Sequence, residues 1–207
     1  ISGQLTASGL PLVASDPHIA FGSISCWYEA HLSGAGFNAA GTGYAGVPGL
    51  LFGRNEKVAW GLTNNICAQR DLYKEKENPK KPGYYLHDGQ WEQADETNVT
   101  INVKGQNPVT QTIRRTRNGP IVDDILPDAA SHTGPVSLRW MGEDPCDEIS
   151  SMLEMNRANN ADQFREALRP WIVPTFSFVF ADFEGHIAYQ ASGRLPIKKD
   201  WDRGYRP

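Results

Sequence analysis

The sequence predicts an α+β fold dominated by antiparallel strands. The first observation is a series of short runs rich in β-branched and aromatic residues, separated by turns of glycine, proline, asparagine and aspartate. The second is that only two segments, both between residues 147 and 170, have the spacing of amphipathic helices. The third is a composition of 40% hydrophobic and 21% charged residues over 207 positions, enough for one good core or at most two small ones.

The predicted strands are apolar runs that end in turn residues. They cover residues 9–14, 24–31, 57–63, 84–87, 90–91, 97–103, 109–116, 136–140, 175–181 and 186–191. Asp88 and Gly89 tolerate the positive φ angles of a tight hairpin, so the runs on either side of them should pair. Over residues 97–103, valine and isoleucine alternate with asparagine and threonine, which predicts one buried face for this strand.

Two helices interrupt the strands. The first follows Asp147 and Glu148, whose carboxylates suit the positive end of a helix dipole. The second is capped by Asn160, with Gln163 three residues later. Their inward faces are sets of residues at helical spacing, namely Ile149, Met152, Leu153 and Asn156 in the first and Phe164, Ala167 and Leu168 in the second.

Composition excludes several classes of protein. The net charge of −4 and the isoelectric point of about 5.7 argue against a nucleic-acid binder, which usually has a basic face. No run of about 18 apolar residues occurs, so no membrane-spanning helix is expected. The three cysteines, Cys26, Cys67 and Cys146, are too few and too far apart for a disulfide framework or a zinc site.

Residues 41–46 read Gly-Thr-Gly-Tyr-Ala-Gly and match the dinucleotide-binding fingerprint letter for letter. That fingerprint needs a helix whose N-terminus faces the pyrophosphate. Here Pro48 and Gly49 follow, and no helical pattern begins. The segment is therefore interpreted as a glycine-rich loop. A nucleotide-dependent enzyme is kept only as a hypothesis for comparison. A helix directly after this loop would support it.

Two further motifs have ordinary structural interpretations. Residues 143–148 are acidic but lack the ligand alternation of a calcium loop, so they are interpreted as a turn that leads into a helix. The glycosylation sequon at Asn98 lies within a predicted strand and is taken as accidental. Neither a Gly-x-Ser-x-Gly elbow nor a His-Glu-x-x-His motif occurs, so the residues alone show no complete active site.

A series of motifs in a fixed order runs through nearly the whole chain. It comprises residues 15–19 (SDPHI), 34–37 (GAGF), 47–55 (VPGLLFGRN), 58–64 (VAWGLTN), 71–73 (DLY), 116–121 (TRNGPI) and 181–187 (ADFEGHI). Each motif is weak by itself, but the ordered set resembles the β subunit of the penicillin acylase family of N-terminal-nucleophile hydrolases. The resemblance implies an αββα sandwich, in which two antiparallel sheets lie between helical layers, incomplete in this chain.

The resemblance also implies a mechanism. In that family a serine that self-cleavage places first in the β subunit attacks an amide carbonyl, and its own α-amine acts as the base. An α-amine titrates near pH ~7.7–8, which suits a general base at neutral pH. Aligned through His18, this serine would precede Ile1, and the family's asparagine oxyanion donor would follow Pro207. We therefore expect residues 1–207 to be a single domain, the N-terminal part of a β subunit truncated at both ends and inactive alone.

Two residues match catalytic positions of the family. Asn64 matches the position whose backbone N–H donates to the oxyanion, an interaction typically worth roughly 3–4 kcal/mol of barrier. The plainer interpretation of Asn64, a turn residue at a strand end, is compatible with this role. His18 matches a position beside the nucleophile, where it could orient the amine or the leaving group. By itself, a histidine next to Pro17 is more often a structural turn residue.

A further group of residues is assigned to the acyl pocket. Ile19, Phe52, Met155 and Phe176 match acyl-pocket positions of the family, and Leu62 stands next to the oxyanion position. As plain sequence, each is more often a core residue. If they line the pocket, the acyl group is apolar, because a burial site without polar partners rejects charge.

No cofactor is expected to be required. Asp71 matches one of the family's calcium ligands, but a neighbouring acidic ligand position holds Ala68, so calcium is considered only for the full-length parent. The implied partners are the α subunit, the remainder of the β subunit and a small acyl amide substrate, with neither nucleic acid nor a membrane span. The resemblance also implies a zymogen that is exported to the periplasm or secreted.

The leading hypothesis is that the parent protein is an amidohydrolase. It would split an N-acyl bond into a carboxylic acid and an amine, with β-lactam side chains and acyl-homoserine lactones among the possible substrates. The alternative is a non-catalytic, β-rich binding module derived from the same family. An upstream gene sequence without a serine after a processing site would favour this alternative.

Overall fold

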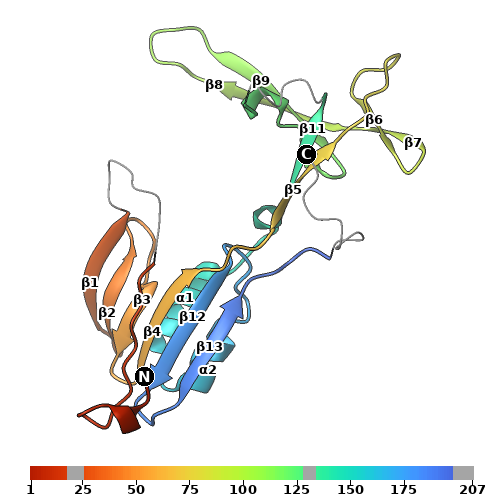
Figure 1. The fold of residues 1–207 in the computed structure, drawn as a ribbon. Helices are drawn as coiled ribbons and strands as arrows, with labels where there is room; N and C mark the ends of the chain where they lie inside the picture. The colour runs from red at the N-terminus through yellow and green to blue at the C-terminus, as the bar shows by residue number, and fades with distance from the viewer. Residues whose placement is uncertain (18–25, 128–133, 198–207) are drawn as a thin grey trace. The chain divides into compact units, whose positions relative to one another are not determined.

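The computed structural model describes residues 1–17, 26–127 and 134–197 (Figure 1). Within these ranges strands outnumber helices, and the paired strands of each sheet are antiparallel. The predicted α+β fold dominated by antiparallel strands is confirmed. None of the helices in the described ranges has the length and apolar character needed to cross a membrane.

Backbone contacts divide the chain into two compact units. Unit 1 consists of Ile1–Cys67 and Met141–Pro207, and unit 2 consists of Ala68–Trp140. Unit 2 is thus an insertion between two halves of unit 1. The expectation of a single domain over residues 1–207 stays a prediction.

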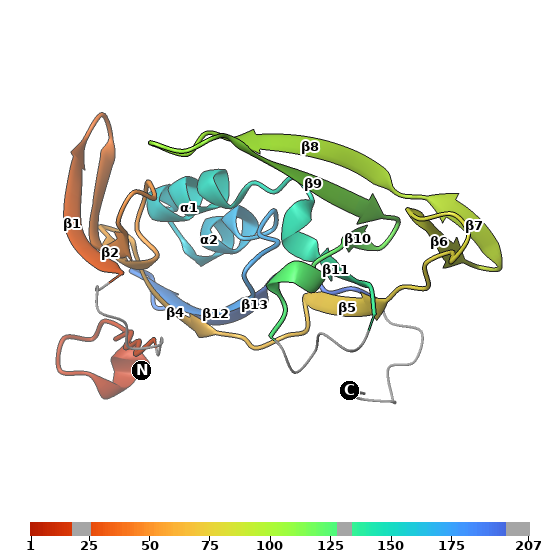
Figure 2. The ribbon, with the colours of Figure 1, turned by 90° about the horizontal axis from the view of Figure 1, so that it is seen from above.

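Unit 1 is built on a six-stranded sheet with the order β1-β2-β3-β4-β12-β13. Its strands are β1 (Trp27–Gly34), β2 (Phe37–Tyr44), β3 (Phe52–Asn55), β4 (Val58–Asn64), β12 (Phe176–Asp182) and β13 (Ile187–Ser192). Figures 1 and 2 show two helices, α1 (Glu148–Arg157) and α2 (Ala161–Ala167), lying side by side against one face of the sheet. Unit 1 also contains two short 3-10 helices, η1 (Gly3–Leu5) and η4 (Met141–Glu143).

The core of unit 1 fills the space between the sheet and the helices. Alternate residues of β12 face the helices, since Phe176, Phe178 and Phe180 are buried whereas Val179 is 36% exposed. Phe164 of α2 packs onto these rings, with centroid distances of 4.5 Å to Phe180 and 6.4 Å to Phe178. Because aromatic side chains bury large apolar areas, this cluster holds α2 on the sheet.

The inner face of α1 differs in part from the predicted one. Met152 and Asn156 are buried as predicted, but Ile149 is 45% exposed, and Met155, which the helical spacing did not place on this face, is fully buried. The Asn156 side chain accepts the N–H of Leu50 at 2.7 Å and donates to the Leu50 carbonyl at 2.8 Å. Because a buried amide must be satisfied, this pair of hydrogen bonds turns Asn156 inward and sets the face that α1 presents to the sheet.

Asn55 ties the β3–β4 turn to the C-terminal end of α1. Its Oδ1 accepts the N–H groups of Lys57 and Val58, both at 2.7 Å. Its Nδ2 donates to the carbonyls of Asn156 at 3.0 Å and Ala158 at 2.8 Å. The asparagine that ends the motif at residues 47–55 therefore has a structural explanation.

The N-terminus of α2 agrees with the prediction. Asn160 Oδ1 accepts the N–H of Gln163 at 2.9 Å, which is the expected capping bond. On the inner face, Phe164 and Leu168 are both buried as predicted.

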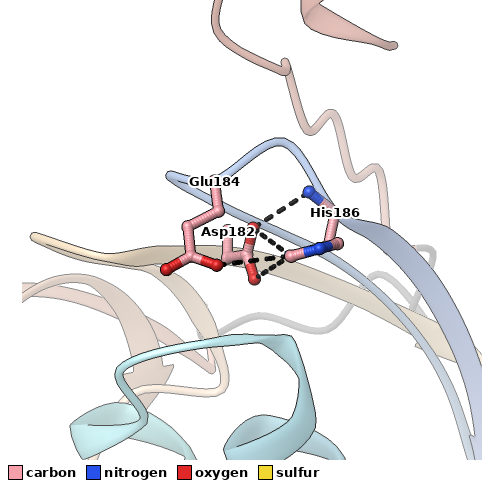
Figure 3. Close-up of side chains that lie close together, drawn as sticks. All are labelled: Asp182, Glu184 and His186. Carbon is pink, nitrogen blue, oxygen red and sulfur yellow. Dashed lines mark hydrogen bonds and ion pairs between the residues drawn. The ribbon is translucent and has the colours of Figure 1, made fainter.

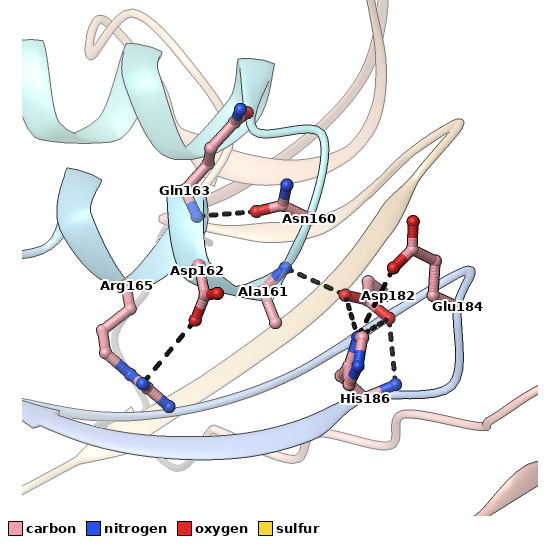
Figure 4. Close-up of polar contacts among 8 residues, drawn as sticks. All are labelled: Asn160, Ala161, Asp162, Gln163, Arg165, Asp182, Glu184 and His186. Atoms are coloured by element: carbon pink, nitrogen blue, oxygen red, sulfur yellow. Dashed lines mark hydrogen bonds and ion pairs between the residues drawn. The ribbon is translucent and has the colours of Figure 1, made fainter.

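Asp182, the last residue of β12, joins the β12–β13 turn to the start of α2 (Figures 3 and 4). Its buried carboxylate accepts the N–H of Ala161 at 3.1 Å and the N–H of His186 at 2.9 Å, and His186 Nδ1 lies 2.9 Å from Oδ2. Burial raises the pKa of Asp182, but the hydrogen bonds from Ala161 and His186 outweigh burial and hold this pKa below its usual value. The side-chain hydrogen bond between His186 and Asp182 raises the pKa of His186.

Unit 2 contains small antiparallel sheets. Their strands are β5 (Arg70–Lys74) paired with β11 (Val136–Trp140), β6 (Tyr84–His87) paired with β7 (Gln90–Gln93), and β9 (Val109–Thr116) lying between β8 (Asp95–Ile101) and β10 (Gly119–Pro120). A 3-10 helix, η2 (Asp123–Ile125), follows β10. Asp88 and Gly89 have φ angles of 45° and 82°, which confirms the predicted hairpin turn between β6 and β7.

A buried carboxylate links these sheets. Glu75 Oε1 accepts the hydroxyl of Thr116 at 2.9 Å, the amide of Asn118 at 3.0 Å and the hydroxyl of Ser137 at 2.6 Å. Two of the three donors belong to the motif at residues 116–121. That motif therefore organises unit 2 by donating hydrogen bonds to a buried polar side chain.

The predicted buried face over residues 97–103 is wrong. β8 is exposed along its whole length, with Val99 39% and Ile101 52% exposed. Its partner β9 is nearly as open, and Val109 is 51% exposed. Alternation of apolar and polar residues makes one face of a strand suitable for burial. Pairing with a neighbouring strand, however, satisfies only the backbone groups and leaves the side chains of both faces uncovered.

The interpretation of residues 41–46 as a loop is wrong in part. Gly41 to Tyr44 belong to β2, and the turn after them leads into β3 and not into a helix. A Cβ atom at Gly41 would lie 2.2 Å from the carbonyl oxygen of Phe52. Glycine is needed here because β2 and β3 approach each other closely, so the fingerprint match reflects strand packing.

We expect the variant Glu148→Gln to lose about 1 kcal/mol of unfolding free energy at pH 7. Glu148 Oε1 accepts the N–H groups of Ile172 at 2.7 Å and Val173 at 2.9 Å. Burial raises the pKa of Glu148, but hydrogen bonds from the Cys146 thiol and from these two amides outweigh burial and lower it.

This stabilisation should be complete above the unfolded pKa near 4.5 and should be lost as the pH falls through the lower folded pKa. Urea denaturation at pH 7, 5 and 3.5, followed by tryptophan fluorescence, measures it. The difference between wild type and variant should shrink at pH 3.5. A difference that is the same at all three pH values would contradict the charged role of Glu148.

Candidate functional site

Four of the predicted site residues lie at one end of the unit 1 sheet. Asn64 is the last residue of β4 and is paired with Phe176, the first residue of β12. Leu62 lies two positions earlier on β4. Phe52 begins β3, and the residue after it is paired with Trp60 of β4. Folding therefore gathers residues that are distant in the sequence at the C-terminal end of β4.

The main-chain amide of Asn64 is directed away from β12. The N–H of Asn65 donates to the carbonyl of Thr175 at 3.1 Å, so the preceding residue of this antiparallel ladder has its N–H on the opposite edge of β4. Leu62 agrees with this alternation, because its carbonyl accepts the hydroxyl of Ser15 at 2.8 Å. The Asn64 amide thus faces the edge of β4 at which Ser15 lies.

Ser15 is seated directly on Gly61 of β4. A Cβ atom at Gly61 would lie 2.3 Å from the Cβ atom of Ser15, so a larger residue would displace the segment that carries this serine. Sequence reasoning did not assign Ser15 or Gly61 to the site. The sequence feature that could have identified them is that Ser15 belongs to the motif at residues 15–19 and Gly61 to the motif at residues 58–64. The structure places these two motifs side by side.

Thr175 holds the start of β12 beside the residues that follow Asn64. Its hydroxyl donates to the carbonyl of Asn65 in a short hydrogen bond, and its own carbonyl accepts the Asn65 amide. The indole N–H of Trp171 donates to the carbonyl of Pro174 at 2.8 Å. These bonds fix the backbone at the end of β4, and sequence reasoning missed Thr175 because its partner is 110 positions away.

Most of the residues assigned to the acyl pocket are core residues in this conformation. Leu62, Phe176 and Met155 belong to the buried cluster of unit 1, with exposures of 2%, 4% and 0%. Phe52 is half-buried and makes an edge-to-face contact with Trp27, with centroids 4.8 Å apart. Their role in an acyl pocket stays a prediction.

The remaining predicted residues do not join this group. His18 and Ile19 lie outside the described residues. Asp71 lies on β5 of unit 2, directly opposite Arg139 of β11. Among the residues that the structure describes, Asp71 belongs to no group of three metal-ligating side chains. The role of Asp71 as a calcium ligand in the full-length parent stays a prediction.

Two hollows among the described residues lie away from Asn64. One in unit 2 has a volume of about 20 Å³ and is lined by Glu75, Glu92 and Arg117, among others. This volume is enough for about one water molecule. A shallow hollow of about 390 Å³ lies on β1 and β2, between Glu29 and Thr42. Neither is lined by the residues assigned to the acyl pocket.

The chemistry available at the end of β4 is that of a fixed hydrogen-bond donor. The direction of the Asn64 N–H is set by the ladder with β12. The exposed position of Asn64 contrasts with the buried Leu62. The end of β4 therefore has a polar main-chain group at Asn64 next to a buried apolar side chain at Leu62.

We expect the variant Gly61→Ala to release the segment around Ser15. The added methyl group would overlap the Ser15 Cβ atom, and backbone on both sides limits the relief. Hydrogen exchange of residues 11–17 should rise at least tenfold, because the hydrogen bond to Leu62 is lost together with the packing.

The matched control is Ser15→Ala, which removes the hydroxyl but keeps the contact. It should cost only about 0.5–1.5 kcal/mol and raise exchange less than Gly61→Ala does. Equal exchange in Gly61→Ala and wild type would show that the close approach is unimportant.

Comparison with known proteins gives a consistent result. The profile of the penicillin amidase family ("Penicillin amidase") matches residues 1–207. The acyl-homoserine lactone acylase QuiP of Pseudomonas aeruginosa is 32% identical over 218 residues, which is 100% of this chain and 25% of that protein. Penicillin G acylase of Escherichia coli is 28% identical over 189 residues, 91% of this chain and 22% of that protein. The chain thus spans about a quarter of the length of these relatives.

A solved structure is similar in fold. The thermostable penicillin G acylase from Alcaligenes faecalis, in its orthorhombic form, superposes with a TM-score of 0.72 and 27% sequence identity. The match covers 87% of this chain and 32% of that chain. The antiparallel sheets described above therefore match the fold of this acylase.

Proposed function

Because the chain belongs to the penicillin amidase family, we propose that the protein carrying it is an amidohydrolase. It cleaves the N-acyl bond of a small substrate and releases a carboxylic acid and an amine. The relatives named above are acylases, which supports hydrolysis of non-peptide amide bonds. The observation that carries the proposal at the level of residues is the direction of the Asn64 amide at the end of β4.

In the proposed mechanism an N-terminal serine outside this chain supplies the nucleophile. Its hydroxyl oxygen attacks the amide carbonyl carbon, and its α-amine takes the hydroxyl proton. The carbonyl oxygen becomes an oxyanion and accepts the N–H of Asn64. Collapse of the intermediate breaks the C–N bond, the amine leaves with the proton, and water then hydrolyses the acyl-serine ester to the acid.

The proposed substrate has an apolar acyl group. Leu62 and Phe176 are buried apolar side chains at the end of β4, and Phe52 at the start of β3 is a half-buried ring, so the surroundings of the Asn64 amide are apolar. A charged acyl group would lose its hydration there without gaining a partner. Since one named relative acts on acyl-homoserine lactones, we propose N-acyl-homoserine lactones as the first class to assay.

We also propose that this chain works as part of a larger assembly. The nucleophile and a second oxyanion donor would come from the remainder of the β subunit, and part of the acyl pocket would come from an α subunit. The proposed location is the periplasm or the outside of the cell, which the resemblance to exported acylases suggests.

The test is an assay of the full-length, processed protein beside the 207-residue chain. Both are incubated with butanoyl- and decanoyl-homoserine lactone and with a phenylacetyl amide, and the released amine is measured by fluorescent labelling. We expect the full-length protein to release amine and acid in equal amounts and the 207-residue chain to release none. A folded, processed full-length protein that turns over none of these amides would favour the non-catalytic binding module.

A further inference from the structure

The β12–β13 turn gathers three side chains that can ligate a metal. Asp182, Glu184 and His186 each offer one ligand atom, and these atoms lie within 4.8 Å of one another. His186 Nδ1 is 2.9 Å from Asp182 Oδ2 and 3.9 Å from Glu184 Oε2. Figure 3 shows the two carboxylates on the same side of the imidazole, with the contacts of the ring to both drawn as dashed lines. The group lies outside the site proposed for amide hydrolysis.

The central ligand is already oriented by the main chain. The side chain of Asp182 is 1% exposed, and its two oxygens accept the N–H groups of His186 and Ala161 (Figure 4). Each oxygen keeps a lone pair, and both oxygens lie close to His186 Nδ1. Hydrogen bonds that hold a ligating carboxylate in place are a regular part of metal sites.

The other two ligands are open to solvent. The side chain of His186 is 65% exposed and that of Glu184 is 74% exposed. An ion can therefore reach the cluster from outside, and water can complete its coordination. One buried and fixed ligand beside two accessible ones differs from a run of solvated acidic residues.

We propose that the β12–β13 turn binds a divalent transition-metal ion, Zn²⁺ by the chemistry of its donors, through His186 Nδ1 and one oxygen each of Asp182 and Glu184. Bonds of about 2.0–2.2 Å at tetrahedral angles separate ligand atoms by about 3.3–3.6 Å. The separations of 2.9 and 3.9 Å bracket this range. Because imidazole is a poor ligand for Ca²⁺ and Mg²⁺, the donor set selects against those ions.

Binding exchanges a proton for the metal. In the metal-free turn, His186 Nδ1 shares a proton with Asp182. The ion takes the place of the proton on Nδ1: an imidazolium releases this proton to solvent, whereas a neutral imidazole keeps its one proton on Nε2. Because Asp182 also accepts the N–H of Ala161, the ion would strengthen the link between the β12–β13 turn and the start of α2. The ion thus stabilises the folded state by mass action and takes no part in amide hydrolysis.

The test is titration of the EDTA-treated, dialysed protein with ZnCl₂, followed by calorimetry and by thermal unfolding. We expect one ion per chain at this site and a rise in melting temperature with Zn²⁺. The variants His186→Asn and Glu184→Gln should each weaken binding by at least about tenfold, since even the loss of a supporting partner costs 10–100-fold. Asparagine at position 186 keeps a hydrogen-bond donor for Asp182.

The matched control is His87→Asn. His87 lies 3.2 Å from the carboxylate of Asp88, so this variant removes an imidazole that also lies beside a carboxylate but is outside the proposed site. It should leave the affinity unchanged. A titration with Co²⁺ in place of Zn²⁺ tests whether the cysteines are the ligands. Ligation by cysteine thiolates gives an intense near-ultraviolet absorption band, whereas the nitrogen and oxygen ligation proposed here does not.

Several results would overturn the proposal. These are the absence of saturable Zn²⁺ binding at millimolar concentration, an affinity in His186→Asn equal to that of wild type, or an equal loss in His87→Asn. If His186→Asn unfolds in EDTA, the affinity of Glu184→Gln is the deciding measurement, because the Glu184 side chain is mostly exposed and its replacement should not unfold the protein. Wild-type affinity in Glu184→Gln then counts against the site.

Discussion

Replacing Asn64 by proline in the full-length protein is expected to lower kcat by about two to three orders of magnitude. Proline has no N–H group, so the substitution removes the proposed oxyanion donor itself. Because the Asn64 amide is directed away from β12, the hydrogen bond from Asn65 to Thr175 is preserved. Thr63 is already extended within β4, which is the conformation that a following proline requires.

The matched control for this experiment is Asn64→Ala, which changes the side chain but keeps the N–H group. Its kcat should stay within a few-fold of the wild-type value. Melting temperatures of both variants, measured in the same buffer, separate a loss of chemistry from a loss of folding. Equal kcat values in the proline and alanine variants, with both proteins folded, would remove Asn64 from the mechanism.

The variant Phe178→Ala should lose about 3–5 kcal/mol of unfolding free energy. Phe178 is fully buried, and its ring lies 5.5 Å from that of Trp171 and 6.0 Å from that of Phe176 in edge-to-face contacts. Truncation removes apolar burial and leaves a cavity between β12 and the helices. Because the neighbouring rings are large and fixed, the cavity can close only in part.

Val179→Ala is the control for this variant, because it alters the next residue on the other face of β12. Val179 is 36% exposed, so its truncation should cost less than about 1 kcal/mol. Urea denaturation followed by tryptophan fluorescence compares the two variants. Similar losses in both would mean that the helix-covered face of β12 is not the core of unit 1.

Several motifs that suggested an enzyme family turn out to have structural roles in this chain. Asn55 joins the β3–β4 turn to α1, and Gly61 admits Ser15 against β4. In unit 2, Thr116 and Asn118 satisfy the buried Glu75. These roles explain how short, separate segments can identify a fold, because each supplies a contact that the backbone geometry requires.

The parts of the fold that follow from neighbouring residues could be predicted. The hairpin at Asp88 and Gly89, the cap at Asn160 and the strand at residues 109–116 all agree with the structure. In each case the interactions that decide the conformation lie within one turn or between strands that are adjacent in the chain. Turn geometry, capping and the pairing of adjacent strands act at that range.

Predictions failed where distant residues decide the outcome. Gly41 lies in a strand because β2 approaches the backbone at Phe52 closely. Ile149 lies seven positions before the buried Asn156 and therefore on the same face of α1, yet it is 45% exposed in the first turn of the helix. Asn156 itself is held inward by Leu50, which is 106 positions away. Periodicity cannot report a partner of this kind.

The sequence by itself determined the α+β class, most strands, both helices and, through its ordered motifs, the family. Only the tertiary structure decided that β4 pairs with β12, that the Asn64 amide is on the edge shared with Ser15, and that Asp182, Glu184 and His186 converge. The physical reason is that register and edge direction depend on hydrogen bonds between strands far apart in the chain, whereas periodicity and turn chemistry depend on neighbours.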